Sequence, residues 1–120
     1  LGGVLEAVVG AMVDLGAEAG RIHAAVGPCI GPDSYEVGAD FPLPFRAREE
    51  GRFFRPAPRP GHHLFDLPGY VRYRLGRAGV ATELLGRDTL AEPDRFFSYR
   101  RSCLQKDGDY GRMLSAIVLE

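Results

Sequence analysis

Two adjacent arginines are the side chains of this sequence best suited to hold a charged ligand. Arg100 and Arg101 follow two phenylalanines, Ser98 and Tyr99, and together form the densest polar cluster of the chain. Guanidinium groups bind phosphate and carboxylate through paired N–H donors. We therefore predict that Arg100 and Arg101 bind an anionic group of a substrate. The alternative is a solvated strand end at which these arginines pair with nearby aspartates.

Cys29 is a candidate nucleophile because it lies between two Gly-Pro pairs, in a turn-rich loop at residues 27–32. A thiol near the backbone N–H groups of a following helix start would have a lowered pKa. A cysteine hydrolase of this kind would pair Cys29 with His23 or His63. The alternative for Cys29 is a small buried side chain, which is a common environment of a free cysteine.

The histidines and cysteines do not show the spacing of a metal site. His62 and His63 are adjacent, so on a strand their side chains would point to opposite faces of the sheet. No Cys-x-x-Cys or His-Glu-x-x-His pattern occurs, and two cysteines with three histidines cannot build a multicopper cluster. The sequence therefore offers no metal ligands, and we expect these 120 residues to bind zinc weakly or not at all.

Length and composition indicate one globular domain over residues 1–120. The chain is 45% hydrophobic and 26% charged, which is typical of a compact domain. Fifteen basic and sixteen acidic residues leave a net charge of -1, which argues against nucleic acid as a partner. The longest apolar stretch, residues 4–15, is interrupted by charged residues and glycine, so no membrane span is expected. With two cysteines and no signal peptide, a reducing cytoplasm is the predicted location.

Alternation of apolar segments with turn residues predicts a mixed α/β fold of layered sheets and helices. We expect long helices at residues 4–15 and 66–79, the first ended by Gly16 and the second by Gly79. A short helix capped by Asp33 or Ser34 would run through residue 37. Residues 41–61 read as surface loop, with a helical turn at 45–50. The predicted strands are residues 21–26, 80–85, 96–101 and 113–119.

Four motifs in order along the chain resemble one known family. They are GPCIGP with SYEVG at residues 27–38, FDLPxY at 65–70, FFSYRR at 96–101 and DYGRMLSAI at 109–117. Together they resemble the purine nucleoside phosphorylase family that was long labelled multicopper polyphenol oxidoreductase or laccase-domain, and which includes the peptidoglycan editing factors.

The resemblance implies a cytoplasmic α/β enzyme that cleaves purine nucleosides such as adenosine or inosine with phosphate, and in some members deaminates them. Zinc is the metal that the resemblance implies. Family members place their metal-binding histidines and reactive cysteine in an Ala-Asp-Cys and a His-Ala-Gly-Trp-Arg-Gly segment, and neither segment occurs here. The resemblance thus implies the carboxy-terminal portion of a laccase-domain-like fold, a partial domain that is inactive alone.

Two other classes stay open: a non-catalytic binding or assembly module, and the cysteine hydrolase using Cys29. We also expect residues 27–38 to form an ordered loop at a concave surface, because glycine and proline restrict its backbone path. Short strands that are apolar on both sides need cover on two faces. We therefore expect exposed apolar surface, and self-association or pairing with a missing half.

Overall fold

The computed structural model describes residues 3–42, 49–106 and 108–118 of the chain. Helices and short strands alternate, as expected for a mixed α/β protein. In chain order they are α1 (Val4–Asp14), a 3₁₀ turn (Ala19–Arg21), β1 (His23–Val26), β2 (Glu36–Val37), a 3₁₀ helix (Glu49–Phe53), β3 (Phe54–Pro56), β4 (His63–Phe65), α2 (Leu67–Arg77), β5 (Ala81–Leu84) and α3 (Tyr99–Gln105).

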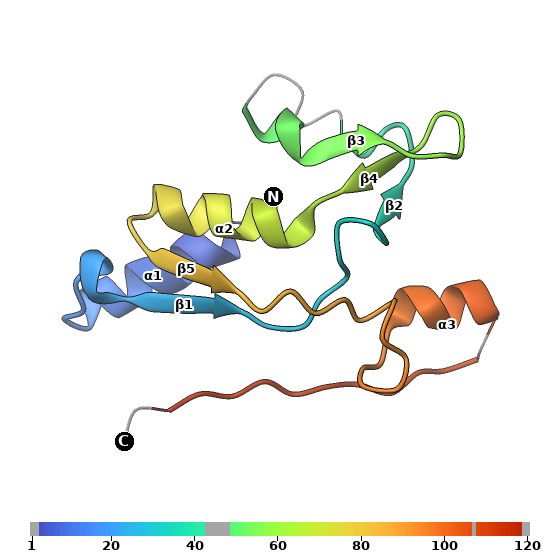
Figure 1. Cartoon of the computed structure of the whole chain (residues 1–120). Coiled ribbons are helices and arrows are strands. Elements are labelled where there is room, and N and C mark those ends of the chain that lie inside the picture. Colours follow the sequence, from blue (N-terminus) through green and yellow to red (C-terminus); the bar gives the residue numbers. More distant parts are fainter. Residues whose placement is uncertain (1–2, 43–48, 107, 119–120) are drawn as a thin grey trace.

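Strands β1 and β5 form a parallel pair, in register from His23 with Ala81 to Val26 with Leu84. Helix α2 contacts both strands, and α1 packs against α2 (Figure 1). The buried residues of this layer are aliphatic: Val9, Leu75 and Val80. The apolar residues of α1 recur at a spacing of three and four, which predicts that one face of the helix is buried. Val9 on this helix is indeed buried in the core.

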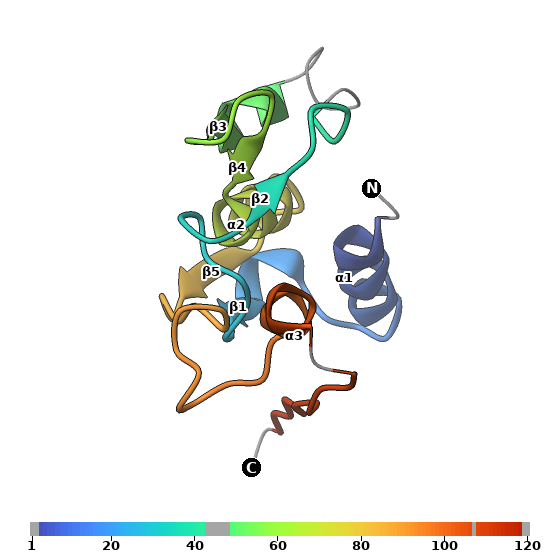
Figure 2. The same ribbon diagram turned by 90° about the vertical axis from the view of Figure 1, so that its right-hand side faces the viewer.

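The second sheet is antiparallel, with β4 between β2 and β3. Its core is aromatic: Phe65 packs with Tyr70 of α2, and the Phe54 and Phe65 rings stack with centroids 4.6 Å apart. Figures 1 and 2 both place α2 between the two sheets. One helix therefore joins an aliphatic cluster and an aromatic cluster.

The predicted start and end of α2 are confirmed. The Asp66 carboxylate accepts a hydrogen bond from the Gly69 N–H at 3.0 Å and so caps the helix, with Pro68 in the first turn. A Cβ atom at residue 69 would lie 2.2 Å from Asp66 Oδ2, so this close capping contact needs glycine. After the helix, Gly79 takes a left-handed conformation with φ 84°.

The helix predicted at residues 4–15 and the strands predicted at 21–26 and 80–85 are present, with ends shifted by one or two residues. The short helix predicted through residue 37 is wrong, because residues 32–34 form a turn that leads into β2. Val37 is buried in the aromatic cluster, and Glu36 pairs with Leu64 of β4. Tertiary pairing therefore overrides the local capping signal.

The strand predicted at residues 96–101 is also wrong. Ser98 Oγ accepts a hydrogen bond from the Arg101 N–H at 3.2 Å, and Ser98 caps α3. Aromatic residues favour strands, but a serine cap at the right position begins a helix here.

The segment predicted as surface loop at residues 41–61 contains a 3₁₀ helix and β3, and the unpredicted β4 follows it. Of the helical turn predicted at 45–50, residues 45–48 lie outside the described part. The predicted strand at 113–119 is not formed over residues 113–118: this segment runs extended in Figure 1 without pairing to a strand of the described chain, and residue 119 is not described.

None of the helices within the described residues has the length and apolar character that crossing a bilayer requires.

Candidate functional site

The loop of residues 27–38 leaves the carboxyl end of β1 and lines three cavities. We name them the edge cavity, the aromatic cavity and the basic cavity. The edge and aromatic cavities share Cys29, and the aromatic and basic cavities share Arg100. The loop is ordered and borders concave surface, which confirms the prediction made from its glycines and prolines.

The edge cavity lies beyond the carboxyl ends of β1 and β5. Its volume is about 320 Å³, and its lining includes Cys29, Gly86, Arg87 and Asp88. Gly86 has φ 72°, a conformation that allows the chain to turn immediately after β5. Ligands of open α/β sheets bind at this edge, because the connecting loops there leave a crevice between neighbouring strands.

Asp88 links the loop after β1 to the loop after β5, and both loops line the edge cavity. Its Oδ1 accepts hydrogen bonds from the Leu90 N–H at 2.9 Å and the Ala91 N–H at 3.2 Å, and the Ser34 hydroxyl donates to Oδ2. A Cβ atom at residue 31 would lie 2.5 Å from Oδ2, so Gly31 permits the approach of the carboxylate. Burial raises the pKa of Asp88, but hydrogen bonds from Ser34 and from the backbone together outweigh it and hold the pKa below its usual value.

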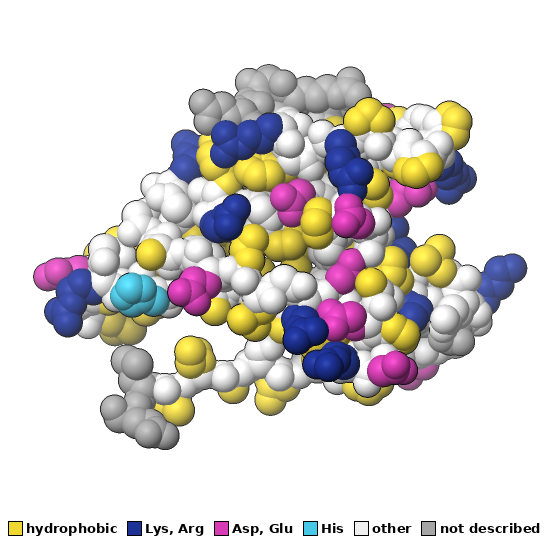
Figure 3. All heavy atoms as spheres, in the orientation of Figure 1, with side chains coloured by type: hydrophobic (Ala, Val, Ile, Leu, Met, Phe, Trp, Pro, Cys, Tyr) yellow, Lys and Arg dark blue, Asp and Glu magenta, His cyan; other side chains and the backbone are white. Residues whose placement is uncertain are grey.

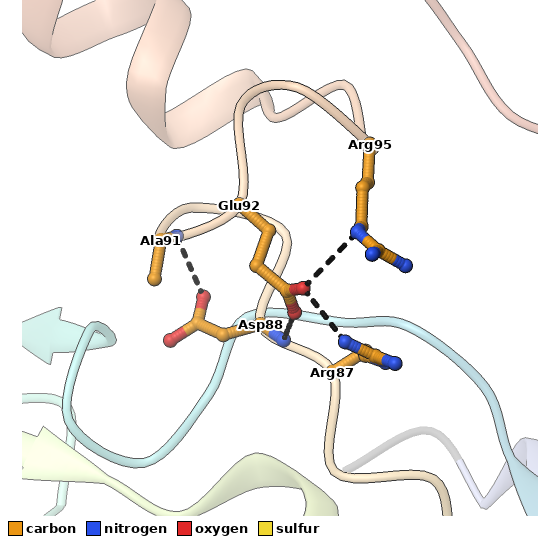
Figure 4. A network of polar contacts seen from close by, with 5 residues as sticks. All are labelled: Arg87, Asp88, Ala91, Glu92 and Arg95. Carbon is orange, nitrogen blue, oxygen red and sulfur yellow. Dashed lines mark hydrogen bonds and ion pairs between the residues drawn. The ribbon is translucent and has the colours of Figure 1, made fainter.

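Glu92 contacts the backbone of Asp88 and two neighbouring arginines (Figure 4). Its Oε2 accepts a hydrogen bond from the Asp88 N–H at 3.1 Å. Its Oε1 lies 3.0 Å from Arg87 Nη1 and 3.9 Å from Arg95 Nε. The charge of Arg87, which lines the edge cavity, is therefore partly balanced within the protein.

Cys29 is half-buried, and its surroundings disfavour the thiolate. Burial is the main cause that raises the pKa of its thiol, and the carboxylates of Asp88 and Asp66 raise it further. Neither His23 nor His63 lines either of the two cavities that Cys29 borders. His23 lies at the amino end of β1, whereas Cys29 follows its carboxyl end. This geometry does not favour the cysteine hydrolase hypothesis, because a nucleophilic thiol needs a lowered pKa or a neighbouring base.

The two predicted anion-binding arginines have different surroundings. Arg101 Nη1 donates to the Thr89 carbonyl at 2.8 Å and its Nη2 donates to the Phe96 carbonyl at 2.5 Å. These bonds tie the segment before α3 to the helix. Arg100 Nη1 donates to the Glu36 carbonyl at 2.7 Å, and its guanidinium carbon lies 5.4 Å from the Tyr35 ring centre. Only Arg100 of the pair lines the aromatic and basic cavities.

The aromatic cavity has a volume of about 330 Å³ and is bordered by Tyr35, Phe97, Tyr99, Met113 and Arg100, among others. Tyr35 comes from the loop after β1, whereas Phe97 and Tyr99 lie two residues apart at the start of α3. Aromatic rings around a cavity of this size suit a flat apolar group with polar edges.

The basic cavity has a volume of about 340 Å³ and lies between the turn that joins β3 to β4 and helix α3. Its lining includes the arginines Arg59 and Arg100, the carboxylate of Glu36 and the imidazole of His62. Sequence reasoning missed Arg59 and considered His62 only as a metal ligand. The sequence around Arg59 carries only turn signals, and neither residue is near Arg100 along the chain, so no spacing could indicate their meeting.

Within the described residues, the side chains of histidine, cysteine, aspartate and glutamate form no group of three or more that could hold a metal ion. The buried Nδ1 of His63 has no hydrogen-bond partner in the described part of the chain, and His63 belongs to no such group there. The described residues thus do not fit zinc.

Comparison with known proteins decides the family. The family model described as multi-copper polyphenol oxidoreductase laccase matches residues 1–120. The chain belongs to this laccase-domain family. Similar family members include purine nucleoside phosphorylases of Deinococcus radiodurans, which is 40% identical over 99% of this chain, and of Rickettsia prowazekii, which is 31% identical over 98%. The Escherichia coli purine nucleoside phosphorylase YfiH is 35% identical over 98% of this chain.

A solved structure is also similar. The crystal structure of the Neisseria meningitidis protein NMB0706 superposes with a TM-score of 0.69 and is 36% identical, over 83% of this chain and 41% of that one. The chain spans about half the length of the curated relatives, from 44% to 49% of the three named above. It therefore corresponds to part of the domain of this family.

Proposed function

We propose that the chain is the carboxy-terminal portion of a purine nucleoside phosphorylase that cleaves adenosine or inosine with phosphate, with residues 1–120 as a single unit. The names of its relatives support this class of substrate. In the reaction, a phosphate oxygen forms a bond to C1′ of the ribose, and the bond from C1′ to the purine nitrogen breaks. The base leaves with that electron pair and takes up a proton, and ribose 1-phosphate is the second product.

The observation that carries this proposal is the position of Arg100 between an aromatic and a basic cavity. Phosphorolysis needs a flat base and a phosphate side by side. A positive group near both stabilises the negative charge that moves from the phosphate toward the leaving base. Arg100 is thus a substrate-binding residue in the proposal, and Arg101, the second substrate-binding prediction, positions the segment before α3 through its carbonyl contacts.

Zinc is expected from the family resemblance, and residues 3–42, 49–106 and 108–118, which the structure describes, do not provide a fitting ligand set. The roles assigned here to Arg100 and the loop at residues 27–38 concern the binding of phosphate and nucleoside only. A cytoplasmic location and the absence of nucleic acid among its partners complete the proposal.

Self-association is part of the proposal, because apolar side chains are exposed along the carboxy-terminal segment. Leu114, Ile117 and Val118 are each more than four-fifths exposed, and Figure 3 shows apolar side chains along this extended segment. Soluble monomers rarely expose contiguous apolar patches larger than a few hundred Å². Sedimentation should therefore show association that increases with protein concentration, and a stable monomer at high concentration would contradict it.

The test of the proposed activity is the release of free base and ribose 1-phosphate from adenosine or inosine in the presence of phosphate. We expect turnover by the protein at its natural length and a large loss in an Arg100→Ala variant. Arg72→Ala, which removes an exposed arginine of α2, is the matched control and should retain full turnover. Nucleoside binding without any turnover would instead support a non-catalytic binding module.

A further inference from the structure

We propose that Arg59 and His62 form the phosphate subsite together with Arg100, and that the purine lies in the adjoining aromatic cavity against Tyr35, Phe97 and Tyr99. This inference rests on the proposed phosphorolysis and assigns its two substrates to separate places. It makes Arg100 the residue shared by both subsites.

The turn between β3 and β4 brings Arg59 and His62 together. The His62 N–H donates to the Arg59 carbonyl at 3.2 Å, and the Ala57 N–H donates to the His62 carbonyl at 3.0 Å. His62 Nδ1 lies 3.2 Å from the Pro60 carbonyl, and Gly61 adopts φ 75° inside the turn. The hairpin therefore holds the two side chains at one place over the basic cavity.

Positive charge is in excess in this cavity. Two arginines and a histidine face one carboxylate, that of Glu36. The Glu36 Oε1 atom lies 3.7 Å from Arg59 Nη1, and 69% of the Arg59 side chain is exposed. A long, exposed ion pair of this kind contributes little to stability, so Arg59 can exchange it for a phosphate oxygen at small cost.

Arg100 is oriented before any ligand binds. One of its N–H groups donates a hydrogen bond to the Glu36 carbonyl, and the guanidinium lies against the Tyr35 ring. A guanidinium has five N–H donors, and among the described residues no other acceptor engages those of Arg100. The remaining donors are free for a phosphate, and little side-chain entropy is lost on binding.

The aromatic cavity suits the other substrate. Purine rings stack on aromatic side chains, and the rings of Tyr35, Phe97 and Tyr99 border this cavity. Tyr99 is itself backed by Tyr110, whose ring centroid lies 5.1 Å away. Because the cavities share Arg100, a base in one and a phosphate in the other would leave the ribose between them, where C1′ must meet the phosphate oxygen.

Steady-state kinetics of the active protein separates the two subsites. We expect Arg59→Ala to raise the KM for phosphate about tenfold and His62→Ala about threefold, while the KM for adenosine changes less than twofold. Phe97→Leu should show the opposite pattern, with a raised KM for adenosine and an unchanged KM for phosphate. Arg72→Ala should alter neither constant.

Failure of the inference and failure of the proposed function give different results. Turnover with an unchanged phosphate KM in both Arg59→Ala and His62→Ala overturns the subsite and leaves phosphorolysis standing. Absence of turnover with adenosine and inosine in the unsubstituted protein at its natural length overturns the proposed function.

A binding measurement on the 120-residue chain checks the subsite without activity. Calorimetric titration with inorganic phosphate should show saturable binding that Arg59→Ala weakens about tenfold and Arg72→Ala preserves. Equal binding by the two variants, or no saturable binding by the unsubstituted chain, would overturn the subsite.

Discussion

The two sheets of this molecule are stabilised in different ways, although one helix packs on both. The parallel pair β1 and β5 packs against aliphatic side chains, and Leu75 and Val80 are buried together with Val9. The antiparallel sheet is stabilised by aromatic rings, among which Phe65 contacts Phe54 and Tyr70. Helix α2 supplies Tyr70 near its start to one cluster and Leu75 near its end to the other.

This difference explains how the cavities arise. The parallel pair needs long connections, so its carboxyl edge is bordered by the loops that line the edge cavity. The antiparallel sheet uses a tight hairpin instead, and that turn carries Arg59 and His62 to the basic cavity. If α2 couples the aliphatic and the aromatic cluster, a substitution that destabilises one cluster should also destabilise the other. The following predictions test that coupling.

The largest effect is expected from Phe65→Ala in the aromatic cluster. Phe65 is 4% exposed, and truncation of a buried phenylalanine costs about 3–5 kcal/mol of unfolding free energy. Chemical denaturation should show this loss in both the near-ultraviolet and the far-ultraviolet circular dichroism signals. Leu114→Ala, at a largely exposed position, is the control and should change stability by less than about 0.5 kcal/mol.

Leu75→Ala in the aliphatic cluster should cost somewhat less, about 2–4 kcal/mol, because a smaller side chain is removed. The same denaturation experiment should show one transition for all signals. Separate transitions of the aromatic and backbone signals in this variant would mean that the two clusters unfold independently and that α2 does not couple them.

Asp88→Asn should lower the free energy of unfolding by about 1–3 kcal/mol near neutral pH, because hydrogen bonds to a charged carboxylate are lost where the loops after β1 and β5 meet. Because its folded pKa lies below the unfolded value of about 3.9, Asp88 adds stability above that pH. This stability is lost as the pH falls through the folded pKa. Below about pH 4, the free energy of unfolding of the Asp88→Asn variant should therefore depend less on pH than that of the unsubstituted chain.

Equal dependence on pH in the two proteins would contradict the role assigned to Asp88. Asp33→Asn, at an exposed carboxylate, is the control.

Glu6→Gln should have a small effect, about 0.5 kcal/mol, because the Glu6 side chain is partly exposed. Arg74 Nε lies 2.5 Å from Glu6 Oε1 and links α1 to α2, and this hydrogen bond is the main cause that lowers the pKa of Glu6. Thermal unfolding of the two proteins at neutral pH measures the difference. A loss comparable to that of Leu75→Ala would show that the ion pair, rather than aliphatic packing, holds α1 in place.

The smallest effect is expected from Cys29→Ala, which should leave phosphorolysis within about twofold of the unsubstituted rate, less than 0.5 kcal/mol. Burial and neighbouring carboxylates raise the pKa of the Cys29 thiol, so it should also react with iodoacetamide more slowly than the exposed Cys103. Complete loss of activity in Cys29→Ala, with the fold intact, would restore the cysteine hydrolase hypothesis.

The sequence by itself determined the elements whose signals are local. Apolar spacing marked α1, the Asp66 cap with Pro68 and Gly79 delimited α2, and short apolar runs bounded by glycine marked β1 and β5. Glycine and proline also identified residues 27–38 as an ordered loop. These signals act over a few residues, and they decided the structure where no tertiary pairing opposed them, as at the Asp66 cap and the Gly79 turn of α2. The capping signal at residues 33–34 failed because β2 pairs with β4.

Only the tertiary structure decided the second sheet and the grouping of the site, whereas the Ser98 cap that begins α3 is a local signal. Strands of two or three residues, such as β2 and β4, have too few positions to show a period, and they form because Val37 and Phe65 are buried together. Arg100 and Arg101 are neighbours in sequence, yet adjacent residues of a helix point in different directions, so one reaches the cavities and the other binds backbone carbonyls. Arg59 and His62 meet Arg100 only through the packing of a hairpin near α3, a contact between residues about forty positions apart that no local pattern encodes.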